Sequence, residues 1–201
     1  LAGQLKNDTG AIIVFAFGTD YAAYQTAFRL KQQQNLSNPV ILRVVSQDTS
    51  HSQAQLAIAS RIGGFFLDRL AAGLWITIPA LPYPEALELS RNILQSAGVR
   101  RYKTEFVSCP GCGRPLFDLQ GSVAKVKAAF SHLNHLKIAV MGCVVNGPGE
   151  MGDADYGYVG AGNGKVNLYK GRERVKNAIP EQEAIEVLKE LIIAHGDWKE
   201  K

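Results

Sequence analysis

Short apolar runs alternate with longer amphipathic segments through the first hundred residues. The apolar runs are of strand length and lie at residues 11–17, 40–45, 74–78 and 104–108. Between them, residues 21–34, 53–62 and 84–97 repeat apolar positions with helical spacing. Strands that alternate with helices of this length form parallel β/α units. The pattern therefore predicts a parallel sheet, either doubly wound or part of a barrel, with functional groups at the carboxyl ends of its strands.

The pattern changes from residue 104 onward and predicts an α+β arrangement. A helix is predicted over 122–133 and a buried strand over 136–141, which ends, like 104–108, at a cysteine. Strands over 156–159 and 165–169 flank Asn163-Gly164, a pair typical of tight hairpin turns. A further strand over 172–177 precedes a helix that starts at Pro180, where Glu181 and Glu183 complement the helix dipole. We therefore divide the chain into a β/α domain, residues 1–103, and an α+β domain, residues 104–201.

The composition is that of an ordinary globular protein, with 46% hydrophobic and 20% charged residues. No apolar run approaches the 18 or so residues of a membrane helix, and no export signal is visible. Three cysteines are too few, and odd in number, for a secreted disulfide scaffold. We therefore expect a cytoplasmic protein. Because the chain starts at Leu1 in a polar stretch, we expect it to be a fragment of a longer polypeptide.

The net charge of +4 is concentrated in two places. The first is the cluster of Arg100, Arg101 and Lys103; the second is the alternating series Lys170, Arg172, Arg174 and Lys176. In a single strand, the second spacing places all four side chains on one face. That face is either a solvated surface or a dock for an acidic partner or an anionic substrate. Nucleic acid is disfavoured, because no aromatic residues interleave with a basic stripe.

All three cysteines fall in one constellation. Cys109-Pro-Gly-Cys112 forms a short hook, and residues 113–142 separate it from Cys143, which precedes a glycine- and proline-rich loop ending at Glu150. Glycines allow the backbone to approach and bend around a cofactor. The arrangement indicates metal ligation rather than packing. Three thiolates are one short of the usual four for zinc or an iron–sulfur cluster, so a fourth ligand is expected.

Three kinds of site are compatible with these residues. Structural zinc would be completed by His132 and His135, which leaves Cys143 unexplained. A redox dithiol of the thioredoxin type would not require Cys143 either. The third is an iron–sulfur cluster with a weaker fourth ligand. Glu150 is the nearest carboxylate, but spacing alone does not separate it from Asp153 and Asp155.

The two cysteine segments, Cys109-Pro-Gly-Cys-Gly-Arg and Met141-Gly-Cys-Val-Val-Asn-Gly-Pro-Gly-Glu150, resemble the signature of the 4-hydroxy-3-methylbut-2-en-1-yl diphosphate synthase family. These enzymes are iron–sulfur reductases of the methylerythritol phosphate route to isoprenoids. The resemblance covers residues 104–196 and reaches back more weakly to about Phe65. It implies a [4Fe–4S] cluster ligated by Cys109, Cys112, Cys143 and Glu150, with Arg114 and Asn146 as hydrogen-bonding neighbours.

The implied reaction is the two-electron reductive opening of 2-C-methyl-D-erythritol 2,4-cyclodiphosphate to 4-hydroxy-3-methylbut-2-enyl diphosphate, with loss of water. Glu150 would be the ligand that the substrate displaces. Electrons would come from ferredoxin or flavodoxin, both acidic, for which the basic residues 170–176 are a possible dock. The alternatives outside this family are a zinc-stabilised binding module and a plain ferredoxin-like electron-transfer domain.

The first sixty residues depart from the family's substrate-binding barrel and look like the barrel-like insert of its three-domain members. Where that barrel has an Asp-Gly-x-Gly-Asp stretch, this chain has Asp68-Arg-Leu-Ala-Ala-Gly73. We therefore expect a partial barrel-like insert followed by the iron–sulfur domain, with the catalytic barrel missing. Such a fragment would bind the cluster but turn over little substrate. In a plant it would lie in the plastid stroma.

Overall fold

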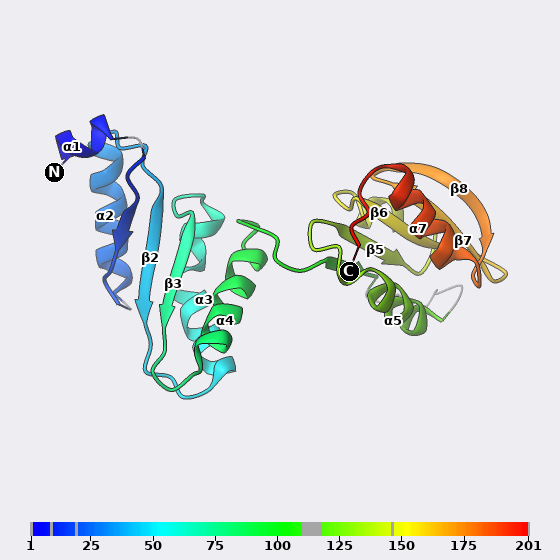
Figure 1. The fold of residues 1–201 in the computed structure, drawn as a ribbon, viewed down its shortest axis with the longest axis horizontal. Coiled ribbons are helices and arrows are strands. Elements are labelled where there is room, and N and C mark those ends of the chain that lie inside the picture. The colour runs from blue at the N-terminus through cyan, green and yellow to red at the C-terminus, as the bar shows by residue number, and fades with distance from the viewer. Residues whose placement is uncertain (1, 9, 19, 110–117, 146, 201) are drawn as a thin grey trace. The chain divides into compact units, whose positions relative to one another are not determined.

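The chain forms two compact units, Leu1–Arg100 and Arg101–Lys201, each with its own sheet (Figure 1). The structure is a computed structural model that describes residues 2–8, 10–18, 20–109, 118–145 and 147–200. Across these residues there are two sheets and seven helices, and neither sheet closes into a barrel. The mixed α/β character predicted from the sequence is confirmed.

Unit 1 is a three-stranded parallel sheet with helices on one face. Its strands, in the order β1-β2-β3, are β1 (Ile13–Phe15), β2 (Val40–Val45) and β3 (Gly73–Thr77). Its helices are α1 (Ala2–Asn7), α2 (Tyr21–Gln33), α3 (His51–Leu67) and α4 (Tyr83–Ser96). Side-chain oxygens of Asp20 and Ser50 cap the first turns of α2 and α3, as these residue types favour. The core lies between the sheet and the helices, where Phe28 of α2 meets Phe65 of α3 with ring centroids 5.0 Å apart.

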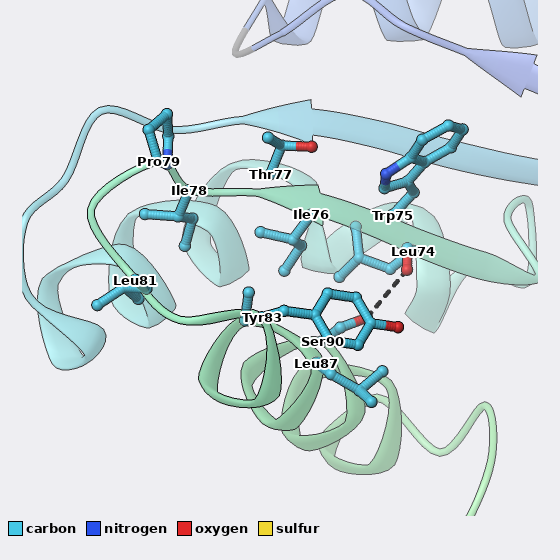
Figure 2. A pocket seen from close by; sticks show the side chains of 11 residues that line it. Leu74, Trp75, Ile76, Thr77, Ile78, Pro79, Leu81, Tyr83, Leu87 and Ser90 are labelled. Atoms are coloured by element: carbon cyan, nitrogen blue, oxygen red, sulfur yellow. Dashed lines mark hydrogen bonds between the residues drawn. The ribbon is translucent and has the colours of Figure 1, made fainter.

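Alternation along β2 separates the two faces of this sheet. Val40, Leu42 and Val44 are buried against the helices, whereas the residues between them are only partly covered. The register continues this division, because Leu42 pairs with Leu74 of β3 and Leu74 points toward α4 (Figure 2). Among the described residues of unit 1, helices pack on one face of the sheet and none covers the other.

Unit 2 is a five-stranded mixed sheet in sequential order. Its strands are β4 (Glu105–Ser108), β5 (Lys137–Met141), β6 (Tyr156–Gly162), β7 (Lys165–Lys170) and β8 (Glu173–Pro180). The first three run parallel, and the last two add antiparallel. Helices α5 (Leu119–Phe130) and α7 (Ala184–Ala194) pack over one face, where Phe130, Tyr158 and Leu188 are fully or almost fully buried. The loop containing α6 (Gly147–Glu150) crosses the other face.

The hairpin between β6 and β7 forms as the sequence predicts. Asn163 and Gly164 have φ angles of 51° and 68°. Positive φ at both central positions is the requirement of the tight turn that matches the twist of paired strands.

The prediction of one basic strand face is wrong. Lys170 ends β7, Gly171 and Arg172 form the turn, and only Arg174 and Lys176 lie on β8. A bulge then separates these two, because Arg174 pairs with Tyr169 whereas Lys176 pairs with Leu168. Tyr169 and Leu168 belong to the cores on opposite faces of the sheet. Arg174 and Lys176 therefore lie on opposite faces too.

The last helix also differs from its prediction. Strand β8 continues to Pro180, and α7 begins only at Ala184. The Glu181 carboxylate instead accepts a hydrogen bond from Ser122 and pairs with Lys125, both on α5. It therefore joins the two helices that cover this face.

Candidate metal centre

Cys109 and Cys143 lie beyond the carboxyl ends of two neighbouring parallel strands. Cys109 directly follows β4, and its backbone N–H donates to the Val140 carbonyl of β5 at 3.2 Å. Cys143 lies two residues beyond the end of β5 and is 6% exposed, whereas Cys109 is half-buried. Because parallel neighbours end at the same edge, both thiol-bearing residues lie at one edge of the sheet. This is the edge at which such sheets carry their sites.

The loop after Cys143 is fixed by backbone hydrogen bonds and one close approach. Gly147 donates its N–H to the Cys143 carbonyl at 3.3 Å, and Met151 donates to the Gly147 carbonyl at 3.0 Å. A Cβ on Gly147 would lie 2.9 Å from the Met141 Cβ and 3.1 Å from Val159 Cγ1. Only glycine fits there, so the turn beside Cys143 is held directly against the ends of β5 and β6.

Glu150, at the end of α6, is exposed. Before it, Val144 and Val145 are also exposed, Val145 at 70%. The carboxylate that follows Cys143 is thus accessible to solvent, while the cysteine itself is buried.

Asp153 and Asp155 have other partners. The Asp153 carboxylate lies 2.6 Å from Lys137 Nζ, and this hydrogen bond holds the pKa of Asp153 below its usual range. Asp155 accepts the Lys137 backbone N–H at 2.7 Å and pairs with Arg101 at 3.1 Å. Lys137 is the first residue of β5, so both carboxylates bind at the sheet edge opposite the one that carries the cysteines. Of the three acidic residues that spacing could not separate, Glu150 is the one without an ion pair or side-chain hydrogen bond to another described residue.

His132 and His135 do not complete a site with the cysteines. Both precede β5, whereas Cys143 follows it, and a five-residue strand spans roughly 16 Å. The His132 ring packs edge-on against Trp198 with centroids 4.9 Å apart, and His135 Nε2 lies 2.9 Å from the Asp197 carbonyl. The zinc site proposed as an alternative is therefore not assembled from these histidines.

Cys112, Arg114 and Asn146 lie outside the described residues, so the expected ligand set can be examined only in part. Among the residues that are described, no three His, Cys, Asp or Glu side chains gather in a group able to hold a metal ion. The donors that are visible do fit an iron–sulfur cluster in chemistry: two cysteines at one sheet edge beside a turn that only glycine can make.

One residue that holds this loop was not foreseen from the sequence. Arg172, in the β7–β8 turn, donates from Nε to the Gly152 carbonyl at 3.2 Å. The residues are twenty positions apart, and their contact depends on how the hairpin folds. No spacing signal could have indicated it.

The α+β segment that carries the cysteine edge, residues 105–194, matches the GcpE protein C-terminal domain. The chain is 47% identical over 169 residues to a protein of Phocaeicola vulgatus named 4-hydroxy-3-methylbut-2-en-1-yl diphosphate synthase (flavodoxin), a match that covers 84% of this chain and 28% of that protein. A protein of the same name from Chlorobaculum tepidum is 44% identical over 202 residues, which cover 98% of this chain and 27% of the relative.

The chain belongs to the 4-hydroxy-3-methylbut-2-en-1-yl diphosphate synthase family. The family resemblance is confirmed, and the similarity covers nearly the whole chain, beyond the residues from Phe65 onward on which the motif resemblance was drawn. The chain spans just over a quarter of the length of the curated relatives it matches. Among the described residues, no helix is both long and apolar enough to cross a membrane.

Proposed function

We propose that this chain is the C-terminal part of an enzyme that reductively opens 2-C-methyl-D-erythritol 2,4-cyclodiphosphate to 4-hydroxy-3-methylbut-2-enyl diphosphate in isoprenoid biosynthesis. The observation that carries the proposal is the pair Cys109 and Cys143 at one sheet edge, within the segment that matches the GcpE C-terminal domain. In this assignment residues 104–201 form the reductase domain and residues 1–103 a barrel-like insert.

In this proposal a [4Fe–4S] cluster is held by the thiolates of Cys109, Cys112 and Cys143 and by the Glu150 carboxylate. When bound, the cluster supplies single electrons and a Lewis-acidic iron to the reaction. The chain supplies the rest. Burial of Cys143 shields its thiolate from water, the Gly147 contact fixes the turn, and exposure of Glu150 leaves its carboxylate able to move aside for a substrate. Arg114 and Asn146 are proposed to hydrogen-bond the cluster or substrate oxygens.

The remaining parts of the reaction come from partners. Several relatives carry flavodoxin in their names, which supports flavodoxin, or the equivalent ferredoxin, as the donor of single electrons. The diphosphate would be held by the catalytic barrel in the rest of the polypeptide, so the isolated chain should hold a cluster without efficient turnover. We place the protein in the cytoplasm, or in the plastid stroma if the source is a plant.

The ligand assignment is tested by anaerobic reconstitution of the wild type, Cys143→Ser, Glu150→Ala and Asp153→Ala. The wild type should contain about four irons and four sulfides per chain with broad brown absorption. Cys143→Ser should lose most of the cluster, whereas Glu150→Ala should assemble one that readily loses a single iron. Asp153→Ala is the matched control, because its carboxylate lies in the same loop but pairs with Lys137.

Two results would contradict this assignment. Glu150→Ala and Asp153→Ala could give identical iron content and spectra, which would remove Glu150 from the ligand set. A colourless wild type with one zinc per chain would instead favour a structural module.

A further inference from the structure

Glu150 lies between two positions at which the backbone can pivot. Gly149 precedes it, with open space around the place of a Cβ, and Gly152 follows two residues later. Glycine adopts conformations that other residues avoid, so these two positions do little to fix the direction of the carboxylate between them. The buried Met151 side chain anchors the turn to the sheet. The direction of Glu150 therefore depends on what restrains the glycine peptide groups on either side.

The β7–β8 turn binds the second half of the loop containing α6 at two points. Gly171 donates its N–H to the Asp155 carbonyl at 2.8 Å, and Arg172 donates from Nε to the Gly152 carbonyl at 3.2 Å. A Cβ on Gly152 would lie 3.5 Å from Arg172 Nη2 and 3.4 Å from the Gly149 carbonyl oxygen. The guanidinium thus lies where the two glycine peptides come together.

The two contacts differ in what a substitution can remove. The contact from Gly171 is made by the backbone and does not depend on a side chain, whereas that from Arg172 is made by an exposed side chain. Because its donor is charged, the arginine hydrogen bond is stronger than one between neutral groups. Loss of the guanidinium would therefore free the Gly152 peptide while the turn stays attached to the loop.

We propose that Arg172 is a positioning residue for Glu150. Its hydrogen bond to Gly152 holds the turn in the conformation that presents the Glu150 carboxylate to the metal centre, and so sets how readily this ligand is displaced. The inference rests on the proposed function, because it requires Glu150 to be the exchangeable ligand. Arg172 acts through the backbone of the loop and does not itself touch the reacting atoms.

The test is a double-mutant cycle in a full-length polypeptide that carries this chain. Wild type, Arg172→Ala, Glu150→Ala and the double variant are reconstituted without oxygen, and release of the first iron to a ferrous chelator is timed. Arg172→Ala should release this iron about tenfold faster than the wild type, the usual size of such outer-shell effects. Arg172→Lys, which keeps a charged donor, should fall between the two. In the Glu150→Ala background the loss of Arg172 should change the rate by less than about twofold, because both changes act on one ligand.

Arg174→Ala is the matched control. Arg174 is also exposed, carries the same charge and lies two residues further along the chain, on the sheet face that the loop crosses. Its iron release should stay within about twofold of the wild type, as for an ordinary surface substitution. Equal acceleration in Arg172→Ala and Arg174→Ala would show a general effect of charge and overturn the proposal.

Amide hydrogen exchange of the metal-free polypeptide gives a readout that does not need the cluster. The N–H groups of Met151 and Ala154 donate to carbonyls within the loop, at 3.0 Å and 2.8 Å. In Arg172→Ala they should exchange at least about fivefold faster than in the wild type, because the loop opens locally more often. Exchange over β5 should be unchanged; acceleration there as well would mean a general loss of structure and count against a local role.

The outcomes separate this inference from the proposed function. Unchanged loop exchange or unchanged iron release in Arg172→Ala would overturn the role of Arg172 and leave the proposed site intact, as would additive effects in the cycle. Equal iron release from wild type and Glu150→Ala would instead reject Glu150 as a ligand, and the positioning role with it.

Discussion

At the scale of single residues, ion pairs and hydrogen bonds distinguish Asp153 and Asp155 from Glu150. Glu150, Asp153 and Asp155 lie within six positions of one another, and their spacing alone could not rank them as ligands, although the family resemblance favoured Glu150. The loop that carries them crosses a sheet face and ends at the edge opposite the cysteines. There Asp153 pairs with Lys137, and Asp155 pairs with Arg101 and accepts the Lys137 backbone N–H. The distinction depends on strand direction and on partners distant in sequence, so spacing alone could not reveal it.

Gly147 offers a sharp residue-scale prediction. Gly147→Ala should lower the free energy of unfolding by about 1–3 kcal/mol, the usual cost of forcing extra volume into a packed site, because its Cβ would meet Met141 at 2.9 Å. The measurement is denaturant unfolding of the metal-free protein. Gly149→Ala is the control: that glycine has nothing within 4 Å, so the change should stay within about 0.5 kcal/mol. Equal losses in the two variants would show that the close approach does not govern stability.

At the scale of elements, the sequence predicted best where burial is one-sided or complete. Residues 40–45 were predicted as a strand and form β2 with the same limits, because alternate side chains face the core. Prediction failed over 170–176, where the alternating cations span a turn at Gly171, with φ of 56°, and then a bulge. It also missed α6, since Gly-Pro-Gly-Glu has little helix propensity and that short helix depends on backbone contacts to Cys143 and Met151.

The split of the basic series gives a prediction about the electron donor. Lys170, at the end of β7, already pairs with Asp197, 2.7 Å away. Of the two cations on β8, Arg174 is the one on the sheet face that the loop containing α6 crosses. In the full-length enzyme, Arg174→Glu should raise the KM for flavodoxin by about threefold or more, through lost charge complementarity. Turnover driven by a small chemical reductant should be unchanged.

Lys176→Glu is the matched control, because its register places it on the helix-covered face. A rise in KM of the same size for both variants would point to general charge attraction and reject a dock on the loop side.

At the scale of the whole molecule, two sheets with separate cores occupy one chain. The cysteine edge belongs entirely to unit 2, whereas the uncovered sheet face belongs to unit 1. The sequence predicted the mixed α/β character of both halves. It could not show that the first sheet has three strands, because alternating β/α units indicate the elements but not how many strands pair.

The division predicts what the isolated chain can do. The 201-residue chain, reconstituted without oxygen, should show the visible spectrum of the full-length enzyme. If the proposed function holds, its steady-state turnover of the cyclic diphosphate should remain below about 1% of the full-length rate, because the proposed positioning of the substrate by a barrel would be lost. A rate within tenfold of the full-length enzyme would mean that residues 1–201 contain the complete active site.

The close approach at Gly147 also limits how this protein can vary through evolution. Every single-nucleotide missense change in a glycine codon introduces a residue with a Cβ, and at this position that atom would meet Met141 and Val159. Every single-nucleotide missense change at this codon therefore adds a side-chain atom that must be accommodated, whichever glycine codon the gene uses. The closest contact is to the Cβ of Met141, which every residue except glycine carries, so an ordinary change at Met141 cannot relieve it. Position 147 should therefore vary little among functional relatives.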